Sequence, residues 1–245
     1  LYKSFRVISH MIKRFKNIIL VGTSHVSKDS LVEVEKTILK EKPNIIAIEL
    51  DKDRFQTIIL NKRGKSSLKA IRTIGFKGYA FGIIGAWLEK KVSKITKSNP
   101  GAEMKKAIEL AKKEKIPVAL IDINIKSTLK GISKNITWRE KFRFFKEFLK
   151  VAFIKKNQKG IDIRKVPSED KIDELTIQLK KFYPSLYKIL ITDRDIHMSK
   201  GLYKISRTND VVVAVIGAGH VKGIISLLKK EKWPTKKQTG KNSEQ

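Results

Sequence analysis

Residues 17–27 read NIILVGTSHVS, and the interpretation of the whole chain starts from them. A run of β-branched and apolar residues ends at Gly22, His25 follows three positions later, and a helical pattern comes next. Residues 211–224, VVVAVIGAGHVKGI, repeat this order, with the run ending at Gly217 and His220 three positions later. Glycine lets the chain turn sharply where a strand ends. The sequence therefore predicts two junctions of the form strand–GxxH–helix.

Between these junctions the chain alternates buried strands with helices. The apolar runs at 44–50 and 118–122 are typical of parallel strands covered on both faces. Residues 28–42, 51–64 and 98–115 have apolar residues at helical spacing. The two β-rich runs at 5–22 predict a hairpin, and a basic amphipathic helix over the first fifteen residues is the alternative. The predicted fold class is α/β, a mainly parallel sheet with helices on both faces.

The length of 245 residues suits a single α/β domain. We expect this domain to span residues 1–230, with helical insertions at about 66–98 and 124–208 forming a cap, and a disordered polar tail at 231–245. Residues 74–88 are apolar and glycine-rich but too short to span a membrane. They predict a helical hairpin over a cleft, or alternatively a membrane-contacting or lid element.

Composition limits the classes of function. The chain has no cysteine, which excludes disulfides, thiolate zinc sites and a cysteine nucleophile. The net charge of +30 has three explanations: a solvated surface, an anionic membrane or nucleic acid. The sequence argues against nucleic acid as a partner, because the excess charge is mostly lysine spread along the whole chain and no recognition motif stands out. The expected location is the cytoplasm or a membrane surface, and the oligomeric state stays open.

Polar residues stand where the predicted strands end. Glu49 closes one apolar run and Asp122 another, while His25 and His220 follow the remaining two. Ligands of such sheets bind outside the carboxyl ends of the strands, so all four are expected at one edge. Imidazoles and carboxylates together suit zinc, manganese or cobalt, and a bound ion of this kind activates water. The ordinary alternative for each histidine is a loop or capping residue, and for Asp122 a helix cap.

Two arginines are candidate partners of these carboxylates or of a carboxylate on the substrate. They are Arg54, which follows the strand of Glu49, and Arg194, in a late helix. A salt bridge on a helix surface is the alternative for both. His10 and His197 lack the glycine context and are expected to be surface residues.

Several motifs resemble the TraB/PrgY/GumN family, which includes pheromone-shutdown proteins and the animal Tiki proteins. These motifs are GTSHVS at 22–27, IELDKDRF at 48–55, PGAEM at 100–104, LID at 120–122, DRD at 193–195 and GAGHVKGI at 217–224. The resemblance covers about residues 16–225 and implies a fold of the erythromycin-esterase/ChaN-like group. By analogy with Tiki it implies a metal-dependent peptidase whose divalent ion (Mn, Co or Zn) is held by His25, His220 and Glu49.

The resemblance also suggests further roles. Glu49, Arg194 and Asp122 would be catalytic, and a peptide or small anionic ligand would contact Gly22, Ser24, Arg54, Asp195, Gly217 and Gly219. A protein that sequesters such a ligand without turnover, of the pheromone-shutdown type, is the alternative.

The chain departs from the family pattern at three places. Asp53 replaces the first arginine of ELDERR, Asp193 replaces the glutamate of DERD, and residues 122–125 read DINI where the family shows DRDI. The first and third of these changes lie beside Arg54 and Asp122, to which the resemblance assigns roles. Relatives usually continue into a carboxyl-terminal membrane domain, so we expect either a soluble variant or a shortened chain.

Overall fold

A five-stranded sheet organises the structure, a computed structural model that describes residues 12–23, 28–60, 101–153, 169–208 and 210–230. Its strand order is β1-β2-β5-β3-β4. The antiparallel pair β1–β2 is the predicted hairpin, and the other three pairings are parallel. The strands are β1 (Ile12–Phe15), β2 (Ile18–Thr23), β3 (Ile45–Ile48), β4 (Val118–Leu120) and β5 (Val212–Gly217). The prediction of a mainly parallel α/β sheet is therefore confirmed.

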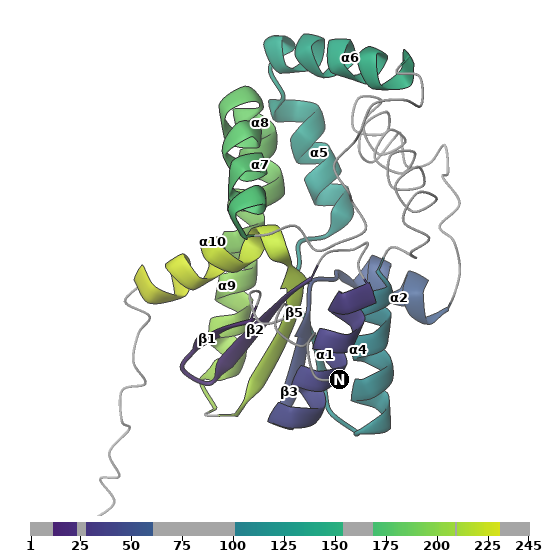
Figure 1. Cartoon of the computed structure of the whole chain (residues 1–245), viewed down its shortest axis with the longest axis vertical. Helices are drawn as coiled ribbons and strands as arrows, with labels where there is room; N and C mark the ends of the chain where they lie inside the picture. The colour runs from purple at the N-terminus through teal and green to yellow at the C-terminus, as the bar shows by residue number, and fades with distance from the viewer. Residues whose placement is uncertain (1–11, 24–27, 61–100, 154–168, 209, 231–245) are drawn as a thin grey trace, which may run out of the picture.

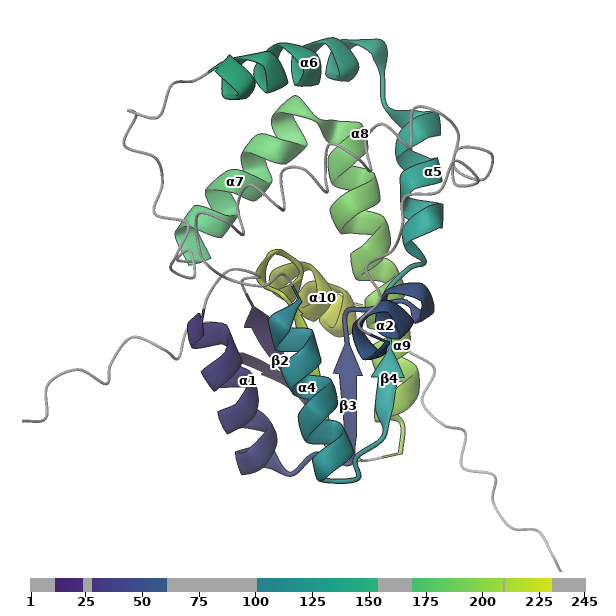
Figure 2. The same cartoon turned by 90° about the vertical axis from the view of Figure 1, so that its right-hand side faces the viewer.

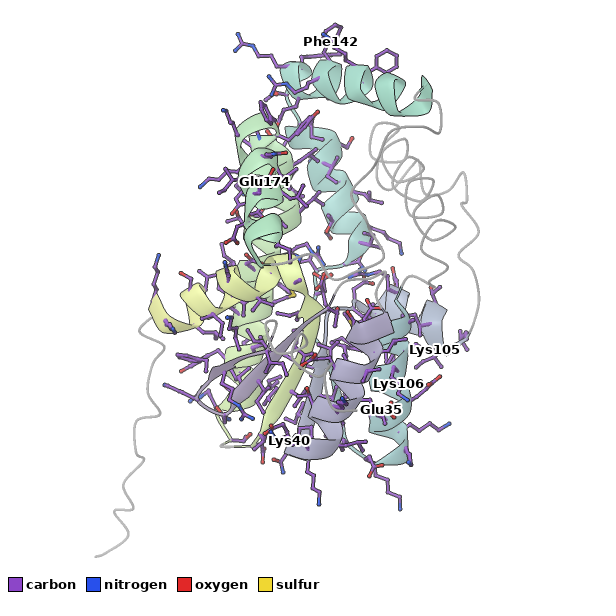
Figure 3. The ribbon with its side chains drawn as sticks, viewed as in Figure 1. Glu35, Lys40, Lys105, Lys106, Phe142 and Glu174 are labelled. Atoms are coloured by element: carbon purple, nitrogen blue, oxygen red, sulfur yellow. The ribbon has the colours of Figure 1, made fainter. Side chains whose placement is uncertain are left out.

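Helices pack against both faces of the sheet, as alternating side chains of the strands require (Figure 1). Val213 and Val215 of β5 pack in one core with α1 (Lys28–Glu41) and α4 (Ala102–Lys113). Val212, Ala214 and Ile216 face the other core, which α9 (Asp193–Ser206) and α10 (Ala218–Lys230) complete. An ion pair of 2.8 Å between Lys106 and Glu35 joins α4 to α1 at the surface (Figure 3).

A helical cap stands above the carboxyl ends of the strands (Figure 2). It contains α5 (Ile125–Asn135), α6 (Trp138–Phe153), α7 (Glu169–Phe182) and α8 (Pro184–Tyr187). A third core holds the cap together, built from Ile132, Ile136, Tyr183, Leu186 and Ile189. The cap thus has apolar packing of its own, apart from the two cores of the sheet.

One long helical stretch links the cap to the sheet. Its first part is α8, a π-helical segment follows at Lys188–Thr192, and α9 continues to Ser206. Leu186 and Ile189 are buried in the cap, whereas Met198 and Leu202 are buried against the sheet. The sequence predicted a single helix at 185–206 and did not indicate the π turn.

Other predictions on helices need correction or fall outside the described residues. Residues 12–15 form a strand, so the alternative of a basic helix over the first fifteen residues is wrong for that part. Helix α2 (Lys52–Ile59) ends at Ile59 and is capped by Leu60, earlier than the predicted end at Gly64. The proposed insertion at 66–98 and the tail at 231–245 lie outside the described residues. Over the part of the chain that the structure describes, no helix is long and apolar enough to cross a membrane.

Candidate functional site

The carboxyl ends of three parallel strands bring together an acid, a second acid and a histidine. Glu49 directly follows β3, Asp122 comes two residues after β4, and His220 lies in the first turn of α10, after β5 ends at Gly217. The expected convergence of these three residues follows from the parallel pairing of β4, β3 and β5. One detail differs from the prediction, which had the helix begin after His220. Helix α10 begins at Ala218 and therefore contains His220.

Glu49 is a buried carboxylate held on three sides. Its Oε2 accepts the backbone N–H of Gly217, and its Oε1 pairs with Nη2 of Arg194 and lies 3.5 Å from Nε2 of His220. Burial raises the pKa of Glu49, but His220, Arg194 and the N–H of Gly217 outweigh burial and leave this pKa below its ordinary range. Glu49 is therefore ionised at neutral pH. Of the two candidate arginines, Arg194 is the cation beside Glu49.

Asp122 forms ion pairs with two arginines below the cap. Its Oδ1 accepts from Nε of Arg194 at 2.9 Å and its Oδ2 from Nη2 at 2.7 Å, a two-pronged contact that fixes the guanidinium plane. Arg54 also reaches Asp122, while its Nε donates to Asp51 at 2.8 Å. Burial would raise the pKa of Asp122, but Arg194 and Arg54 lower it below its ordinary range. Both candidate arginines are thus partners of protein carboxylates.

Asp51 combines a capping role with this ion-pair network. Its Oδ1 accepts the backbone N–H groups of Asp53 and Arg54, which lie in the first turn of α2. Its Oδ2 accepts from the side chain of Arg54 and from the N–H of Ile125, where α5 begins. Asp51 therefore connects the end of β3 to the first helix of the cap.

His220 is oriented by a buried carboxylate that comes from another helix. Nδ1 of His220 lies 2.6 Å from Oδ1 of Asp195. An ionised Asp195 can only accept, so Nδ1 carries the hydrogen and Nε2 is left facing Glu49. Burial raises the pKa of Asp195, and the contact with His220 offsets only part of this rise.

Gly223 makes the approach of Asp195 to α10 geometrically feasible. A Cβ atom at Gly223 would lie 1.9 Å from Oδ2 of Asp195, far inside van der Waals contact. At Gly217 the corresponding Cβ would lie 3.2 Å from Oε2 of Glu49. Two glycines of the motif GAGHVKG thus leave room for the two carboxylates that flank His220. Gly223 was not among the residues predicted for the site, although its position three residues after His220 was a usable signal.

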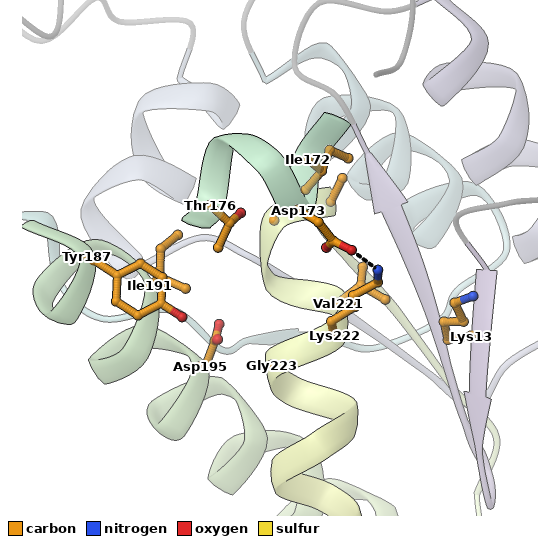
Figure 4. A pocket seen from close by; sticks show the side chains of 12 residues that line it. Lys13, Ile172, Asp173, Thr176, Tyr187, Ile191, Asp195, Val221, Lys222 and Gly223 are labelled. Atoms are coloured by element: carbon orange, nitrogen blue, oxygen red, sulfur yellow. Dashed lines mark hydrogen bonds and ion pairs between the residues drawn. The ribbon is translucent and has the colours of Figure 1, made fainter. Parts of the chain in front are cut away.

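A small pocket adjoins this site, and Asp195 forms part of its wall. Its volume is about 110 Å³, and Figure 4 shows the side chain of Asp195 beside that of Tyr187 at its edge. An ion pair between Asp173 and Lys222 closes another side. Apolar side chains and the backbone of α10 make up much of the wall: Ile172, Tyr187, Ile191, Val221 and Gly219. Among the described residues, nothing lies within 4 Å of a Cβ built on Gly219.

The remaining predicted site residues are placed as follows. His25 and Ser24 lie outside the described residues, so the predicted pairing of His25 with His220 stays a prediction. Gly22 is buried in β2 opposite Ile216. His197 is exposed on α9, as expected. Over the described ranges, no group of three His, Asp or Glu side chains is arranged to hold a metal ion.

Comparison with known proteins connects the chain to one family along most of its length. The model of the TraB/PrgY/gumN family matches residues 8–236. An uncharacterized protein of Methanocaldococcus jannaschii is 38% identical over 218 residues, which cover 87% of this chain and 54% of that protein. The human TraB domain-containing protein is 25% identical over 233 residues, covering 84% of this chain and 61% of the relative. The chain thus spans little more than half the length of these relatives. It belongs to the TraB/PrgY/gumN family.

Proposed function

We propose that this chain carries the active site of a metal-dependent hydrolase that acts on peptides. The observation that carries the proposal is the arrangement of His220 between two buried carboxylates, Asp195 at Nδ1 and Glu49 at Nε2. A histidine that donates through one ring nitrogen to a carboxylate and presents the other is the usual arrangement of a metal-binding imidazole. Peptides as the substrate class rest on the resemblance to Tiki proteins, which is an analogy at the level of the family.

The spacing of the two candidate donor atoms fits one ion. Zinc binds nitrogen and oxygen ligands at about 2.1 Å, so two ligands of a tetrahedral site lie about 3.4 Å apart. The separation between Nε2 of His220 and Oε1 of Glu49 is 3.5 Å. Two donors leave room for further ligands, and we propose His25 as the third. A bound divalent ion would supply Lewis acidity for activating water and polarising the scissile carbonyl.

The other residues of the network would position these groups. Arg194 holds Glu49 and Asp122 in fixed relation, and its side chain is only 15% exposed. The Arg54 side chain is 34% exposed, which makes it the more accessible of the two for a carboxylate on the substrate. The pocket beside Asp195 would receive an uncharged side chain of the peptide, since apolar groups form much of its wall.

Ligand binding without turnover is the second candidate function, and one contact favours it. Oε1 of Glu49, the oxygen nearest His220, is already paired with Arg194. An adjacent guanidinium lowers the basicity of a carboxylate and so weakens it as a proton acceptor. In this case the same cleft would retain a peptide or an anionic ligand without cleaving it.

The decisive experiment combines metal analysis with turnover of a peptide library in the presence of added manganese, cobalt or zinc. If Glu49 is a proton acceptor, Glu49→Gln should keep the metal and reduce turnover by about 10²–10⁴-fold. If it is a ligand, metal and activity should be lost together, as in His25→Ala and His220→Ala. His197→Ala is the matched control, because His197 is an exposed histidine on α9. Absence of turnover with every ion, together with retained peptide binding, would favour the second candidate.

A further inference from the structure

Helix α6 carries an aromatic face that is exposed to solvent. The exposed fractions are 78% for Trp138, 73% for Phe142 and 59% for Phe145. A helix turns by about 100° per residue, so positions i, i+4 and i+7 fall within an arc of about 60°. The three rings therefore form one stripe along the helix. Exposed large aromatic side chains in such a cluster mark an interaction surface.

The opposite side of α6 is fixed to the rest of the cap. Thr137 and Glu140 form a capping box, in which Glu140 accepts the backbone N–H of Thr137 at 2.9 Å. The second oxygen of Glu140 accepts the N–H of Ser185 at 2.7 Å, and Arg143 donates to the carbonyl of Phe182. Since Glu140 lies about 190° around the helix from the middle of the stripe, these contacts direct the rings away from the protein. Phe142 projects from the outer side of the cap in Figure 3.

Cations border the aromatic stripe on both sides. Lys141 lies about 60° to one side of Trp138, and Lys146 and Arg139 lie about 80–100° to the other. Lys141 also stands 4.7 Å from the ring centroid of Trp138. Residues 138–146 contain four cationic side chains and one anionic side chain, Glu140, which is buried.

We propose that α6 docks on the surface of a membrane that contains acidic lipids. Aromatic rings suit the boundary between headgroups and acyl chains, and cations on either side suit the lipid phosphates. A helix of 16 residues with this many charges would lie in the plane of the surface. A second copy of the chain is a poorer occupant, because pairing two such faces brings like charges together in a protein of net charge +30. The membrane arrangement places the cap toward the lipid and the sheet away from it (Figure 2).

The test measures co-sedimentation of the full chain with vesicles of phosphatidylcholine, either alone or mixed with phosphatidylserine. We expect binding to the acidic vesicles only, and release as added salt screens the attraction. The triple variant Trp138→Ala, Phe142→Ala, Phe145→Ala should bind at least about 10-fold more weakly. Its thermal unfolding should be unchanged, since the three rings are exposed in the folded protein.

Two control variants test whether binding depends on the aromatic residues of α6 or on apolar and cationic residues elsewhere on the surface. Ile59→Ala with Leu60→Ala removes exposed apolar side chains at the end of α2 and should leave binding intact. Lys40→Gln, Lys112→Gln and Lys113→Gln remove three charges far from α6 and should weaken binding less than the aromatic variant does. Equal binding of the aromatic variant and the parent chain would overturn the proposal, as would equal binding to neutral vesicles or no binding at all. A dimer of the parent chain that the aromatic variant abolishes would assign the face to a second copy and also overturn it.

Discussion

Replacing Gly223 by alanine tests how the site is held together. The new Cβ would occupy a position 1.9 Å from Oδ2 of Asp195, so the carboxylate must move away from α10. Its hydrogen bond with Nδ1 of His220, at 2.6 Å, would be lost or distorted. Hydrogen bonds to charged groups are worth about 1.5–3 kcal/mol. Alanine in place of a helical glycine returns about 1 kcal/mol, so we expect Gly223→Ala to destabilise the protein by about 0.5–2 kcal/mol.

Gly219→Ala is the matched control, because the same substitution occurs in the same helix without the collision. No described atom lies within 4 Å of its added Cβ, so this variant should gain stability, by at most about 1 kcal/mol. The gain from alanine is common to both variants, so their free energies of unfolding, measured by urea denaturation at neutral pH, should differ by about 1.5–3 kcal/mol. The destabilisation caused by Gly223→Ala should also disappear when Asp195 is replaced by alanine, and a double-mutant cycle would measure this coupling. Equal stabilisation by both alanines would refute the reasoning about Asp195.

Three further predictions concern the ion pairs and the pocket. Removal of one partner from a buried ion pair costs about 3–5 kcal/mol, so Arg194→Met should lower the free energy of unfolding by that amount, and Arg194→Lys by less. The pKa values of Asp122 and Glu140 lie below their ordinary values of 3.8 and 4.5, because ion pairs or hydrogen bonds outweigh burial. The stability that these two carboxylates contribute is therefore full above about pH 5 and is lost as the pH falls through and below those values. The urea midpoint should fall less steeply with decreasing pH in Glu140→Gln than in the parent chain. If the pocket binds a peptide side chain, Gly219→Leu should reduce cleavage of peptides with bulky apolar residues by about 10-fold or more. Cleavage of peptides with alanine at that position should be unaffected. An equal loss for both kinds of peptide would argue against the pocket.

The sheet and the residues at its edge could be predicted because their signals are local. Continuous apolar runs identify strands that are buried on both faces, and parallel pairing brings the ends of such strands together. Glu49, Asp122 and His220 were placed at one edge for this reason, and the structure has them there.

The partners of these residues depended on packing between distant helices and could not be predicted. Arg54 and Arg194 were equivalent candidates in sequence, and only the crossing of α9 over the sheet brings Arg194 to Glu49. The contact of Asp195 with His220 spans 25 residues and requires close approach of two helices. Gly223 permits that approach, but a glycine inside a helix pattern does not reveal which side chain needs the space.

The π-helical segment at Lys188–Thr192 determines which residues of the long helical stretch face the cap and which face the sheet. Each residue of an α-helix adds about 100° of rotation, so the extra residue of a π turn rotates all that follows relative to an uninterrupted α-helix. Loss of one residue there would turn Arg194 and Asp195 away from Glu49 and His220 while the side chains buried in the cap kept their places. The number of residues in this turn therefore fixes the rotation, about the helix axis, of the part that packs on the sheet relative to the part that packs in the cap.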